Sequence, residues 1–509
     1  MKKCISILLA CCAIAGETAA MEGSLSQRIS LKTPGNRAVT YNLRETAEGG
    51  GGILEADRRL PLTVRRQKTE TDDEIRIVLT LTADDLLYYN VEQSFPTGLA
   101  HENCLFYMPG FWYRKNLRSP ESAPSFHTGD SWQVREDRLS TPLTGIYDER
   151  SGTYYTVLRT DTPDCEALAC HNYGEVILSG KTSLGFTGFR NADAHAALVF
   201  GFPYCEAPKS YVRKLTLAPA VRAFEKLEKG ETRRLTWTIR KGASPSYSSF
   251  VAEVWNDSFD TLDPRPVSPR HTPDEAKAIL SEYFSRSYVG KYPLKFTSGV
   301  ELRTADCEST DIAEVGFVGR VLLNAFNALE YAEADGREQL AAEARSIFDS
   351  YLRYGFTPGG LIREVVDFKR EREADVYSIR RQSEGLYALL NYLDYEKRHG
   401  RSHPRWEARI RALLEKFRTL QNPDGSFPRK FRDNLTVVDA SGGSTPSATL
   451  PLTMACAYFG DEAYRRSAVR TADYLEKNLI SKADYFSSTL DPNCEDKEAS
   501  LYAATAMYY

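Results

Sequence analysis

The chain has 509 residues, which is more than one ordinary domain uses and enough for two or three. Hydrophobic residues make up 42% of it and charged residues 26%, as in a folded globular protein, so a disordered or fibrous chain is excluded. The net charge is −4 and no basic stripe occurs, which predicts that nucleic acid and anionic membrane surfaces are not partners.

Residues 1–20 have the pattern of a signal peptide. Lys2 and Lys3 precede a short apolar run, and small residues suited to signal peptidase follow it. The run is too short to span a bilayer, for which about 20 residues are needed, so no transmembrane segment is predicted. The stretch LLAC, which ends at Cys11, is also similar to a lipobox and would make Cys11 a lipidated amino terminus. We therefore expect an exported protein, either periplasmic or an outer-membrane lipoprotein.

Residues 25–242 have the pattern of a β-sandwich domain. The stretches EIRIVLTLT (74–82) and RRLTWTIR (233–240) alternate apolar and polar residues with the period of a half-buried strand. Further short strand patterns are separated by turn signals, and few helical patterns interrupt them. Many strands with few helices predict a large antiparallel sandwich.

Residues 243–290 are interpreted as a linker with a helix. Five prolines between 242 and 273 favour extended chain over helix in that part. Thr272, Pro273 and Glu275 then predict the start of a helix, with a capping box and proline at its first position.

Residues 291–509 change to a helical period. We expect seven helices: one opened by a capping box of Asp311 and Glu314, then 337–354, one from 378, 404–420, one from 445 that stops before Gly460, one that runs to about 478, and one from about Asn493. The first, third and fifth start about 67 residues apart. More apolar helices alternate with more charged ones, as a ring of helical hairpins requires.

Ten cysteines and seven histidines give no metal pattern. The cysteines that remain after residues 1–20 are widely and irregularly spaced, which fits neither a disulfide framework nor a zinc site. None of the histidines lies between 272 and 398 or after 403. A histidine-based metal site or a serine–histidine triad is therefore not expected in the C-terminal half, and no cofactor is predicted.

A sandwich followed by helical hairpins resembles the six-hairpin glycosidases, the (α/α)6-toroid superfamily. The stretches QNPDGSFPRKF (421–431), RRQSEGLYALL (380–390) and DKEASLYA (496–503) are similar to hairpin loops and inner-helix starts of exported polysaccharide-degrading members. The resemblance implies a ring of twelve helices, of which about seven are expected here. The toroid is therefore expected to be incomplete, with roughly 130–170 residues missing by the repeat length.

In such rings the amino-terminal ends of the inner helices face the substrate cleft. The resemblance therefore implies that Glu384, Asp496 and Glu498 are catalytic carboxylates, which act as general acid and base in glycoside cleavage. Two plainer interpretations stay open. Acidic residues in a first turn also stabilise the helix itself, and a glutamate beside two arginines also forms a surface ion pair.

Aromatic, arginine, amide and two carboxylate side chains are the candidates for sugar binding. In the predicted sandwich they are Trp112, Tyr113, Arg114, Arg135, Asp137 and Arg138; in the helical part they are Arg381, Gln382, Gln421, Phe427, Arg429 and Glu495. Tryptophan beside arginine suits stacking on sugars and binding of carboxylates. A core tryptophan with structural Arg–Asp pairs is the alternative. Several arginines at one cleft would favour a uronic acid or another anionic sugar.

These patterns predict an exported glycoside hydrolase that acts on a polysaccharide or oligosaccharide by paired carboxylates. A polysaccharide lyase on the same scaffold is the first alternative, with Tyr113, Tyr377 or Tyr387 as the base. A carbohydrate-binding chain without catalysis is the second. The sequence does not indicate an oligomeric state.

Overall fold

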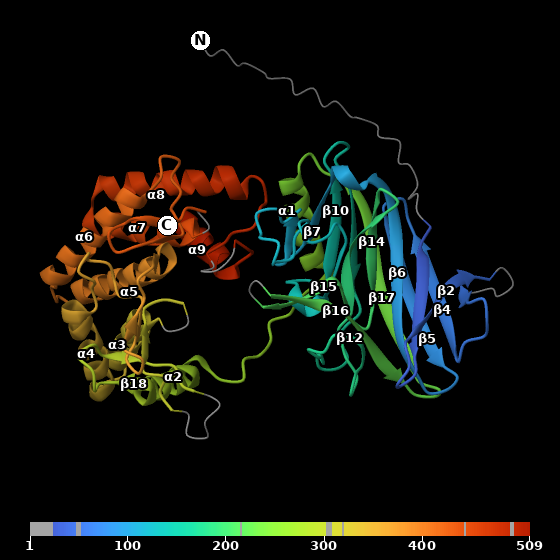
Figure 1. The fold of residues 1–509 in the computed structure, drawn as a ribbon, viewed down its shortest axis with the longest axis horizontal. Coiled ribbons are helices and arrows are strands. Elements are labelled where there is room, and N and C mark those ends of the chain that lie inside the picture. Colours follow the sequence, from blue (N-terminus) through green and yellow to red (C-terminus); the bar gives the residue numbers. More distant parts are fainter. Residues whose placement is uncertain are drawn as a thin grey trace, which may run out of the picture. The chain divides into compact units, whose positions relative to one another are not determined.

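The structure is a computed structural model, and it describes residues 24–46, 52–213, 216–301, 308–317, 320–441, 444–488 and 493–509. They group into two compact units (Figure 1). The sheet-rich unit contains the described residues up to Pro109, with Ser131–Ser210 and Pro219–Thr261. The helical unit contains Gly110–Asp130, Tyr211–Ala218 and Leu262–Tyr509. The predicted signal peptide and Cys11 lie outside the described residues.

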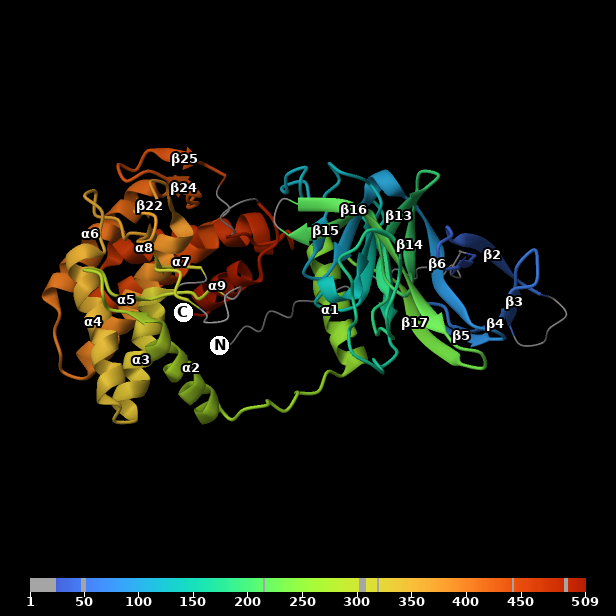
Figure 2. The ribbon, with the colours of Figure 1, turned by 60° about the horizontal axis from the view of Figure 1, so that its bottom comes forward.

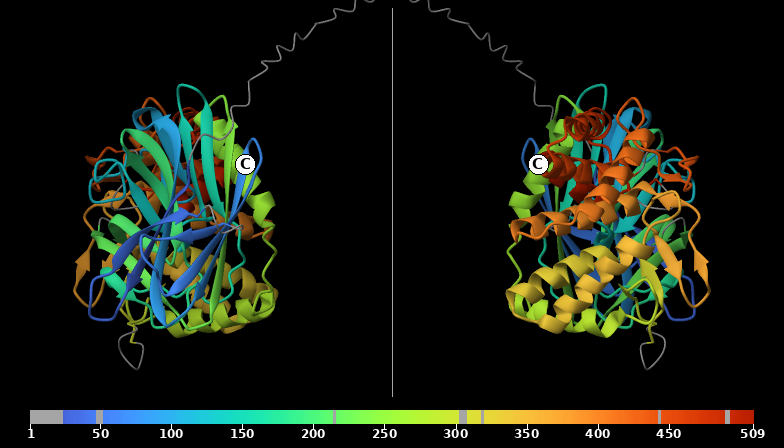
Figure 3. Two further views of the ribbon diagram at one scale, coloured as in Figure 1. Left: turned by 90° about the vertical axis from the view of Figure 1, so that its right-hand side faces the viewer. Right: turned by 90° about the vertical axis from the view of Figure 1, so that its left-hand side faces the viewer.

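Antiparallel strands build most of the sheet-rich unit (Figure 3, left). One sheet has the order β2 (Val39–Glu45), β1 (Ser26–Lys32), β6 (Leu87–Ala100), β14 (His195–Phe202), β13 (Phe186–Ala192), β9 (Trp132–Arg135). The other has the order β3 (Ile53–Glu55), β4 (Leu62–Glu70), β5 (Glu74–Ala83), β17 (Thr232–Ala243), β11 (Thr153–Arg159), β10 (Leu143–Asp148), β7 (Cys104–Met108). Further strands are β12 (Gly174–Ile177), β15 (Cys205–Arg213) and β16 (Thr216–Leu227), while β8 (Trp112–Arg114) lies in the helical unit.

The predicted alternation determines which side of each sheet is buried. In β5, Ile75 and Ile77 are buried while Arg76 between them is exposed. Aromatic rings then connect the two sheets: Phe95 of β6 lies 5.8 Å from Tyr155 of β11, measured between ring centroids. Because apolar side chains from both sheets meet, the two sheets share one hydrophobic core.

Helices dominate the second unit (Figure 2). They are α2 (Pro273–Ser287), α3 (Val321–Ala334), α4 (Glu338–Tyr354), α5 (Ile379–Arg398), α6 (Pro404–Leu420), α7 (Thr445–Phe459), α8 (Glu462–Leu475) and α9 (Lys497–Tyr508). Short strand pairs join them: β18 (Tyr288–Val289) with β19 (Phe296–Thr297); β20 (Ile312–Glu314), β21 (Val365–Asp367) and β22 (Arg372–Glu373); β23 (Tyr377–Ser378), β24 (Lys430–Phe431) and β25 (Val437–Asp439). Among the described residues no helix has the length and apolar character needed to cross a membrane.

The helices pack as a series of hairpins (Figure 3, right). Helices α3, α5, α7 and α9 contact one another in chain order, and α4, α6 and α8 each contact the helix that precedes them. Helix α5 is buried on most of its faces, so it belongs to the inner layer. In contrast, α4, α6 and α8 each bury one stripe and expose the opposite one, as the predicted alternation of apolar and charged helices requires.

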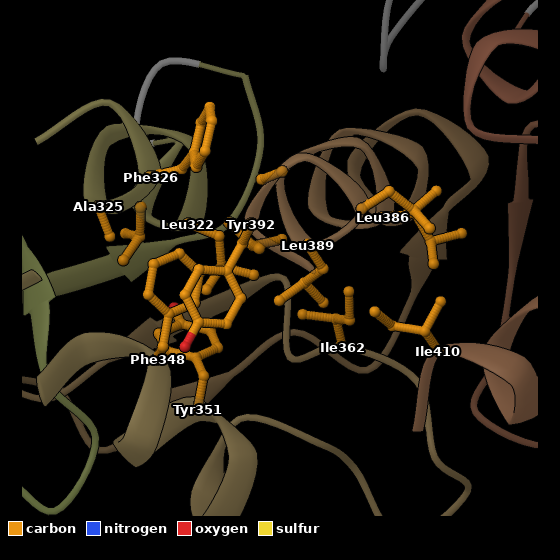
Figure 4. Packing of buried hydrophobic residues seen from close by; sticks show 14 of the residues in the cluster. Leu322, Ala325, Phe326, Phe348, Tyr351, Ile362, Leu386, Leu389, Tyr392 and Ile410 are labelled. Carbon is orange, nitrogen blue, oxygen red and sulfur yellow. The ribbon is translucent and has the colours of Figure 1, made fainter. Parts of the chain in front are cut away.

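The core of this unit lies between the helical layers (Figure 4). Phe348 of α4 stacks on Tyr392 of α5 with 3.8 Å between ring centroids. Leu322 of α3 and Leu389 of α5 are fully buried beside them. This packing fixes the inner helices against each other and therefore fixes the side chains at their ends.

The sequence predicted an extended proline-rich junction, but the structure contains a helix in part of it. Residues Tyr247–Leu262 form helix α1 in the sheet-rich unit, because no proline occurs between Pro245 and Pro264. The capping box at Thr272 is confirmed: its side chain accepts from the Glu275 backbone N–H, and the Glu275 side chain accepts from the Thr272 backbone N–H.

The predicted start of the first ring helix is also wrong. Asp311 accepts hydrogen bonds from Lys291 and Tyr292, and the residues after it form strand β20. Helix α3 starts only at Val321, so the starts of α3, α5 and α7 are not equally spaced. Asp311 has the left-handed backbone conformation (φ 51°), which does not open a helix.

Candidate active site at the starts of α5 and α9

Two inner helices begin with capped, charged first turns. Ser378 caps α5, and its side chain accepts from the Arg381 backbone N–H at 3.2 Å. Asp496 caps α9 and accepts from the Glu498 backbone N–H at 3.0 Å. The caps fix the first turns of both helices; Asp496 and Glu498 lie at the start of α9, while Glu384 follows in the second turn of α5.

Arg380 of α5 connects these two turns. Its guanidinium contacts Glu384 (3.3 Å), Asp496 (3.2 Å) and Glu498, and it also donates to the Ser488 carbonyl oxygen at 3.2 Å. Arg380 is only 2% exposed. Since three carboxylates share one planar group, Glu384, Asp496 and Glu498 lie close together, as the sequence predicted they would.

A second arginine and a tyrosine complete the cluster. Arg320, directly before α3, donates to Glu498 at 2.6 Å and lies 3.8 Å from Glu384. The Tyr502 hydroxyl of α9 donates to Glu384 at 2.6 Å, and the Phe317 backbone N–H also donates to Glu384. Several hydrogen-bond donors therefore hold the Glu384 carboxylate in place.

The cluster has one carboxyl group more than it has arginines. Two arginines face three carboxylates, two of which are almost fully buried, while the Glu498 side chain is 45% exposed. Burial raises the pKa of Asp496, the charge of Glu384 raises it further, and Arg380 offsets only part of this. Burial, followed by Glu384, likewise raises the pKa of Tyr502. A proton is therefore held more firmly at Asp496 than at an ordinary aspartate.

A cavity of about 200 Å³ adjoins the cluster. Its lining includes Val315, Arg320, Ser383, Glu384, Tyr387 and Leu501. A larger cavity of about 660 Å³ lies along α7, α8 and α9, but Asp394 is the one carboxylate among its lining residues. Glu384 is likewise the one carboxylate in the lining of the smaller cavity, but it also belongs to the cluster of three carboxylates around Arg380, so the smaller cavity is the candidate site. Within the described residues, no group of three or more His, Cys, Asp or Glu side chains is arranged to hold a metal ion.

The loop 110–130 belongs to the helical unit and holds the segment that leads into α9. Arg118 donates to the Tyr485 carbonyl oxygen at 2.7 Å, and its guanidinium lies 4.5 Å from the centre of the Tyr485 ring. Arg114 donates to the Lys482 carbonyl oxygen at 3.3 Å. These contacts anchor the chain shortly before Asp496.

Glu495, directly before the α9 cap, is a carboxyl with an altered acidity. Burial raises its pKa to about 7, the charge of Asp496 adds to this, and Lys497 opposes it. Burial and the nearby Glu495 raise the pKa of Tyr113 to about 12. The predicted binding residues Tyr113 and Glu495 are therefore brought together.

The predicted sugar-binding role is wrong for two aromatic residues. Trp112 and Phe427 are both 0% exposed, so neither ring has a face open to a sugar. Phe427 packs against Phe417 in the core of the helical unit, with 6.0 Å between ring centroids. The plainer interpretation of a core tryptophan applies to Trp112.

Both predicted amide side chains form hydrogen bonds within the protein. The Gln382 side chain donates to the Ile362 carbonyl oxygen and accepts from the Ile362 N–H. The Gln421 amide donates to the Ser467 carbonyl oxygen at 2.9 Å and to the Thr471 hydroxyl at 2.7 Å. Both side chains are buried, and these bonds hold loops to helices.

The remaining predicted arginines do not join the cluster. Arg135 donates to Asp137 at 2.8 Å and Arg138 pairs with Glu206, all within the sheet-rich unit. In the helical unit, Arg381 pairs with Glu314, and the Arg429 side chain lies 3.8 Å from Asp439. These are the structural ion pairs that the sequence left as an alternative.

Sequence reasoning missed Arg320, Tyr502 and Glu364. Glu364 is fully buried and accepts from the Ser378 backbone N–H (2.6 Å) and the Gln382 amide (3.1 Å). Burial raises its pKa to about 7, although these hydrogen bonds and Arg381 oppose the change. Glu364 thus holds the residue before β21 to the start of α5, a contact that depends on tertiary packing and is not visible in the sequence. The i,i+4 spacing of Arg380 and Glu384 was the one contact of the cluster visible in the sequence.

The chain was compared with known proteins. It matches no protein-family model, and no curated protein matches it. Several solved structures show weak similarity, and the following three are among them. An unsaturated glucuronyl hydrolase from Bacillus sp. GL1, responsible for the degradation of glycosaminoglycan, is 14% identical with a TM-score of 0.36 and covers 46% of this chain and 68% of its own. A polysaccharide lyase is 8% identical with a TM-score of 0.40 and covers 95% and 83%. A possible member of the GH105 family from Salmonella enterica is 10% identical with a TM-score of 0.35 and covers 51% and 76%.

These three proteins carry names of carbohydrate-active enzymes. At identities of 8 to 14% and TM-scores of 0.35 to 0.40, the function has to be argued from the side chains of this chain.

Proposed function

We propose that this chain is a glycoside hydrolase that cleaves a polysaccharide or oligosaccharide with paired carboxylates. The observation that carries the proposal is the convergence of Glu384, Asp496 and Glu498 on Arg380, beside a cavity that Glu384 lines. Glycoside cleavage needs one carboxyl group that keeps its proton beside other carboxylates, and Asp496, whose pKa is raised, lies beside Glu384 and Glu498.

The electrostatics assign the roles. Asp496 has the raised pKa, so it donates the proton to the glycosidic oxygen as the bond to the leaving group breaks. Glu498 is half exposed and lies within reach of water, so it takes the proton from the attacking water molecule. Glu384 lines the cavity, where it stabilises the positive charge that develops on the sugar ring.

The supporting scaffold is part of the same proposal. We assign the sheet-rich part to a β-sandwich domain of residues 25–242, residues 243–290 to a linker with a helix, and residues 291–509 to helical hairpins of an incomplete (α/α) toroid. The packing of α3, α5, α7 and α9 in chain order supports the toroid, since an inner ring is built in that way.

A polysaccharide lyase is the second candidate, because Tyr387 lines the same cavity as Glu384. A lyase needs a base that removes a proton next to a uronate carboxylate. The other tyrosines suit this role poorly: burial raises the pKa of Tyr113 and Tyr377 to about 12, and the pKa of Tyr502 is also raised. Tyr387 is therefore the tyrosine left for a lyase, and we prefer the hydrolase because Glu384, Asp496 and Glu498 converge beside the same cavity.

One assay separates the candidates. The purified protein is incubated with neutral and uronate-containing polysaccharides, and both reducing ends and the ultraviolet absorbance of unsaturated products are measured. A hydrolase releases reducing ends without the absorbance, a lyase gives both, and a carbohydrate-binding protein gives neither. Asp496→Asn should abolish release, while Asp394→Asn, in the larger cavity, should not. Release that survives Asp496→Asn would overturn the assignment of the acid.

Export is a separate proposal. Residues 1–20 have the signal-peptide pattern, and cleavage before Cys11 would instead give a lipoprotein. Mass spectrometry of the mature amino terminus, after expression in a bacterium that processes both kinds of leader, distinguishes the two. An intact Met1 would contradict export by either route.

A further inference from the structure

The cavity beside Glu384 contains one buried hydroxyl group that the protein leaves without a partner. Ser383 is 2% exposed and lines the cavity, and its Oγ has no hydrogen-bond partner among the described residues. The other serine and threonine hydroxyls of the lining are engaged: Ser447 donates to the Ser444 carbonyl oxygen and Thr505 to that of Leu501. A buried hydroxyl without a partner is unfavourable, and a polar ligand atom in the cavity would relieve this.

The charges at the cavity are already balanced. Arg320 and Glu384 are the charged residues of the lining. Arg320 is committed to Glu498 at 2.6 Å and to Glu384 at 3.8 Å. The neighbouring Arg380 is committed to three carboxylates. No arginine is left over for a ligand carboxylate, because carboxylates of the protein already occupy both.

The size and the walls limit the occupant further. A volume of about 200 Å³ lies below the roughly 300–1,000 Å³ of sites for drug-sized ligands, so it suits one sugar ring. Val315, Leu323, Leu450 and Pro451 provide apolar walls, and the Tyr387 ring provides an aromatic one. The C–H faces of a pyranose pack on such walls, while its hydroxyl groups reach the polar edge at Ser383.

We propose that this cavity is a subsite for one uncharged sugar ring, in which Ser383 recognises a ring hydroxyl, and that it excludes uronates. This inference rests on the proposed function in one respect, namely that the subsite lies beside the bond that is cleaved. It changes the substrate expected from the sequence, where the number of arginines favoured an anionic sugar. The arginines are present, but carboxylates of the protein occupy them.

Binding without turnover tests the inference. Isothermal titration of the purified protein with the methyl glycosides of glucose, galactose and mannose is compared with titration by the matching uronates. At least one neutral glycoside should bind, and its uronate at least about tenfold more weakly, because the carboxylate finds no free cation. A uronate that binds as tightly as its neutral partner, or no binding by any of the glycosides, would overturn the proposal.

Two variants locate the binding in this cavity. Ser383→Ala should weaken neutral-sugar binding about three- to tenfold through loss of one hydrogen bond. Leu501→Trp should abolish it by filling the cavity mouth; Leu501 is 63% exposed, so the larger side chain does not disturb the core. Ser402→Ala, at an exposed position on the α5–α6 connection, should bind like the wild type. Unchanged binding in either cavity variant contradicts the subsite.

The outcomes also separate this inference from the proposed function. Neutral-sugar binding without reducing-end release keeps the subsite and removes the hydrolase. Reducing-end release from uronate polymers, without binding of neutral glycosides, keeps the hydrolase and removes the subsite.

Discussion

An arginine–carboxylate cluster lies at each end of the α3–α5 pair. The two clusters differ in whether the pKa of their carboxyl groups is lowered or raised. At the carboxyl-terminal ends, Arg401 pairs with Glu333 at 2.9 Å and with Glu396, and His403 lies 2.6 Å from Glu396. Burial alone would raise the pKa of Glu396, but the hydrogen bonds from Arg401 and His403 lower it. The pKa of Glu333 is lowered for the same kind of reason, by Tyr395 and Arg401.

At the amino-terminal ends the balance is reversed. Arg380 is shared by three carboxylates, so its charge does not offset the burial of Asp496, and the pKa of Asp496 is raised. Contact with an arginine therefore does not by itself indicate either a structural or a catalytic role. The ratio of acids to bases around the arginine decides whether a proton is retained, and retained protons are what acid catalysis uses.

Removal of the central arginine should have the largest effect on stability. Arg380→Met leaves Glu384 and Asp496 buried without their shared cation, and we expect the free energy of unfolding to fall by about 3–5 kcal/mol. Urea unfolding followed by the helical circular dichroism signal measures this. Arg401→Met is the matched variant at the other end. The Arg401 side chain is 37% exposed and Glu396 keeps His403, so the loss should be less than half as large. Equal losses would remove the contrast between the two clusters.

The next effect is a pH dependence that originates at Glu495. Its pKa is about 7 in the folded chain against 4.5 as the reference, so the folded state holds the proton more tightly. The free energy of unfolding should therefore fall as pH rises from about 4.5 to 7, by about 1–3 kcal/mol, and then stay level. Glu495→Gln should be more stable than the wild type at pH 8 and should have a smaller slope. Glu364 contributes a remaining slope of the same sign.

An exposed glutamate provides the control for that slope. Glu338→Gln, in the first turn of α4, should leave the pH dependence of unfolding as it is in the wild type. A Glu495→Gln variant whose stability still falls by the full amount between pH 4.5 and 7 would show that Glu495 titrates normally.

A smaller effect should follow from loosening the segment before α9. Arg118→Ala removes the hydrogen bond to the Tyr485 carbonyl oxygen and the 3.2 Å ion pair with Asp484. We expect a loss of about 1 kcal/mol, seen as faster amide hydrogen exchange in residues 484–488. Arg286→Ala removes an exposed ion pair within α2 and should change exchange nowhere near α9. Protection in 484–488 that is unaffected by Arg118→Ala would contradict the anchoring role of the loop 110–130.

Much of the helical part could be predicted from sequence because its signals are local. The segments 337–354 and 404–420 have a clear helical period, and the structure has α4 at Glu338–Tyr354 and α6 at Pro404–Leu420. Thr445 and Gly460 likewise bound α7 as predicted. The start of α3 could not be found in this way, because β20 forms only by pairing with a distant strand, β21.

The carboxylates of the site could be predicted because each lies near the start of a predicted helix. Glu384, Asp496 and Glu498 follow from their places at helix starts, but Arg320 and Tyr502 enter the cluster through the packing of α3 and α9. Trp112 was predicted to bind sugar but is buried. A tryptophan near arginines gives the same sequence pattern whether it is exposed or buried. Burial depends on tertiary packing, which the residue pattern does not contain.

The most direct measurement compares turnover after the same substitution at the two ends of α5. Glu384→Gln and Glu396→Gln each replace one buried carboxylate by an amide, and both variants are assayed on a polysaccharide that the wild type degrades, at a temperature where both are folded. We predict that Glu384→Gln loses at least about a hundredfold in kcat while Glu396→Gln stays near the wild type. Wild-type turnover by Glu384→Gln, or an equal loss in both variants, would contradict it.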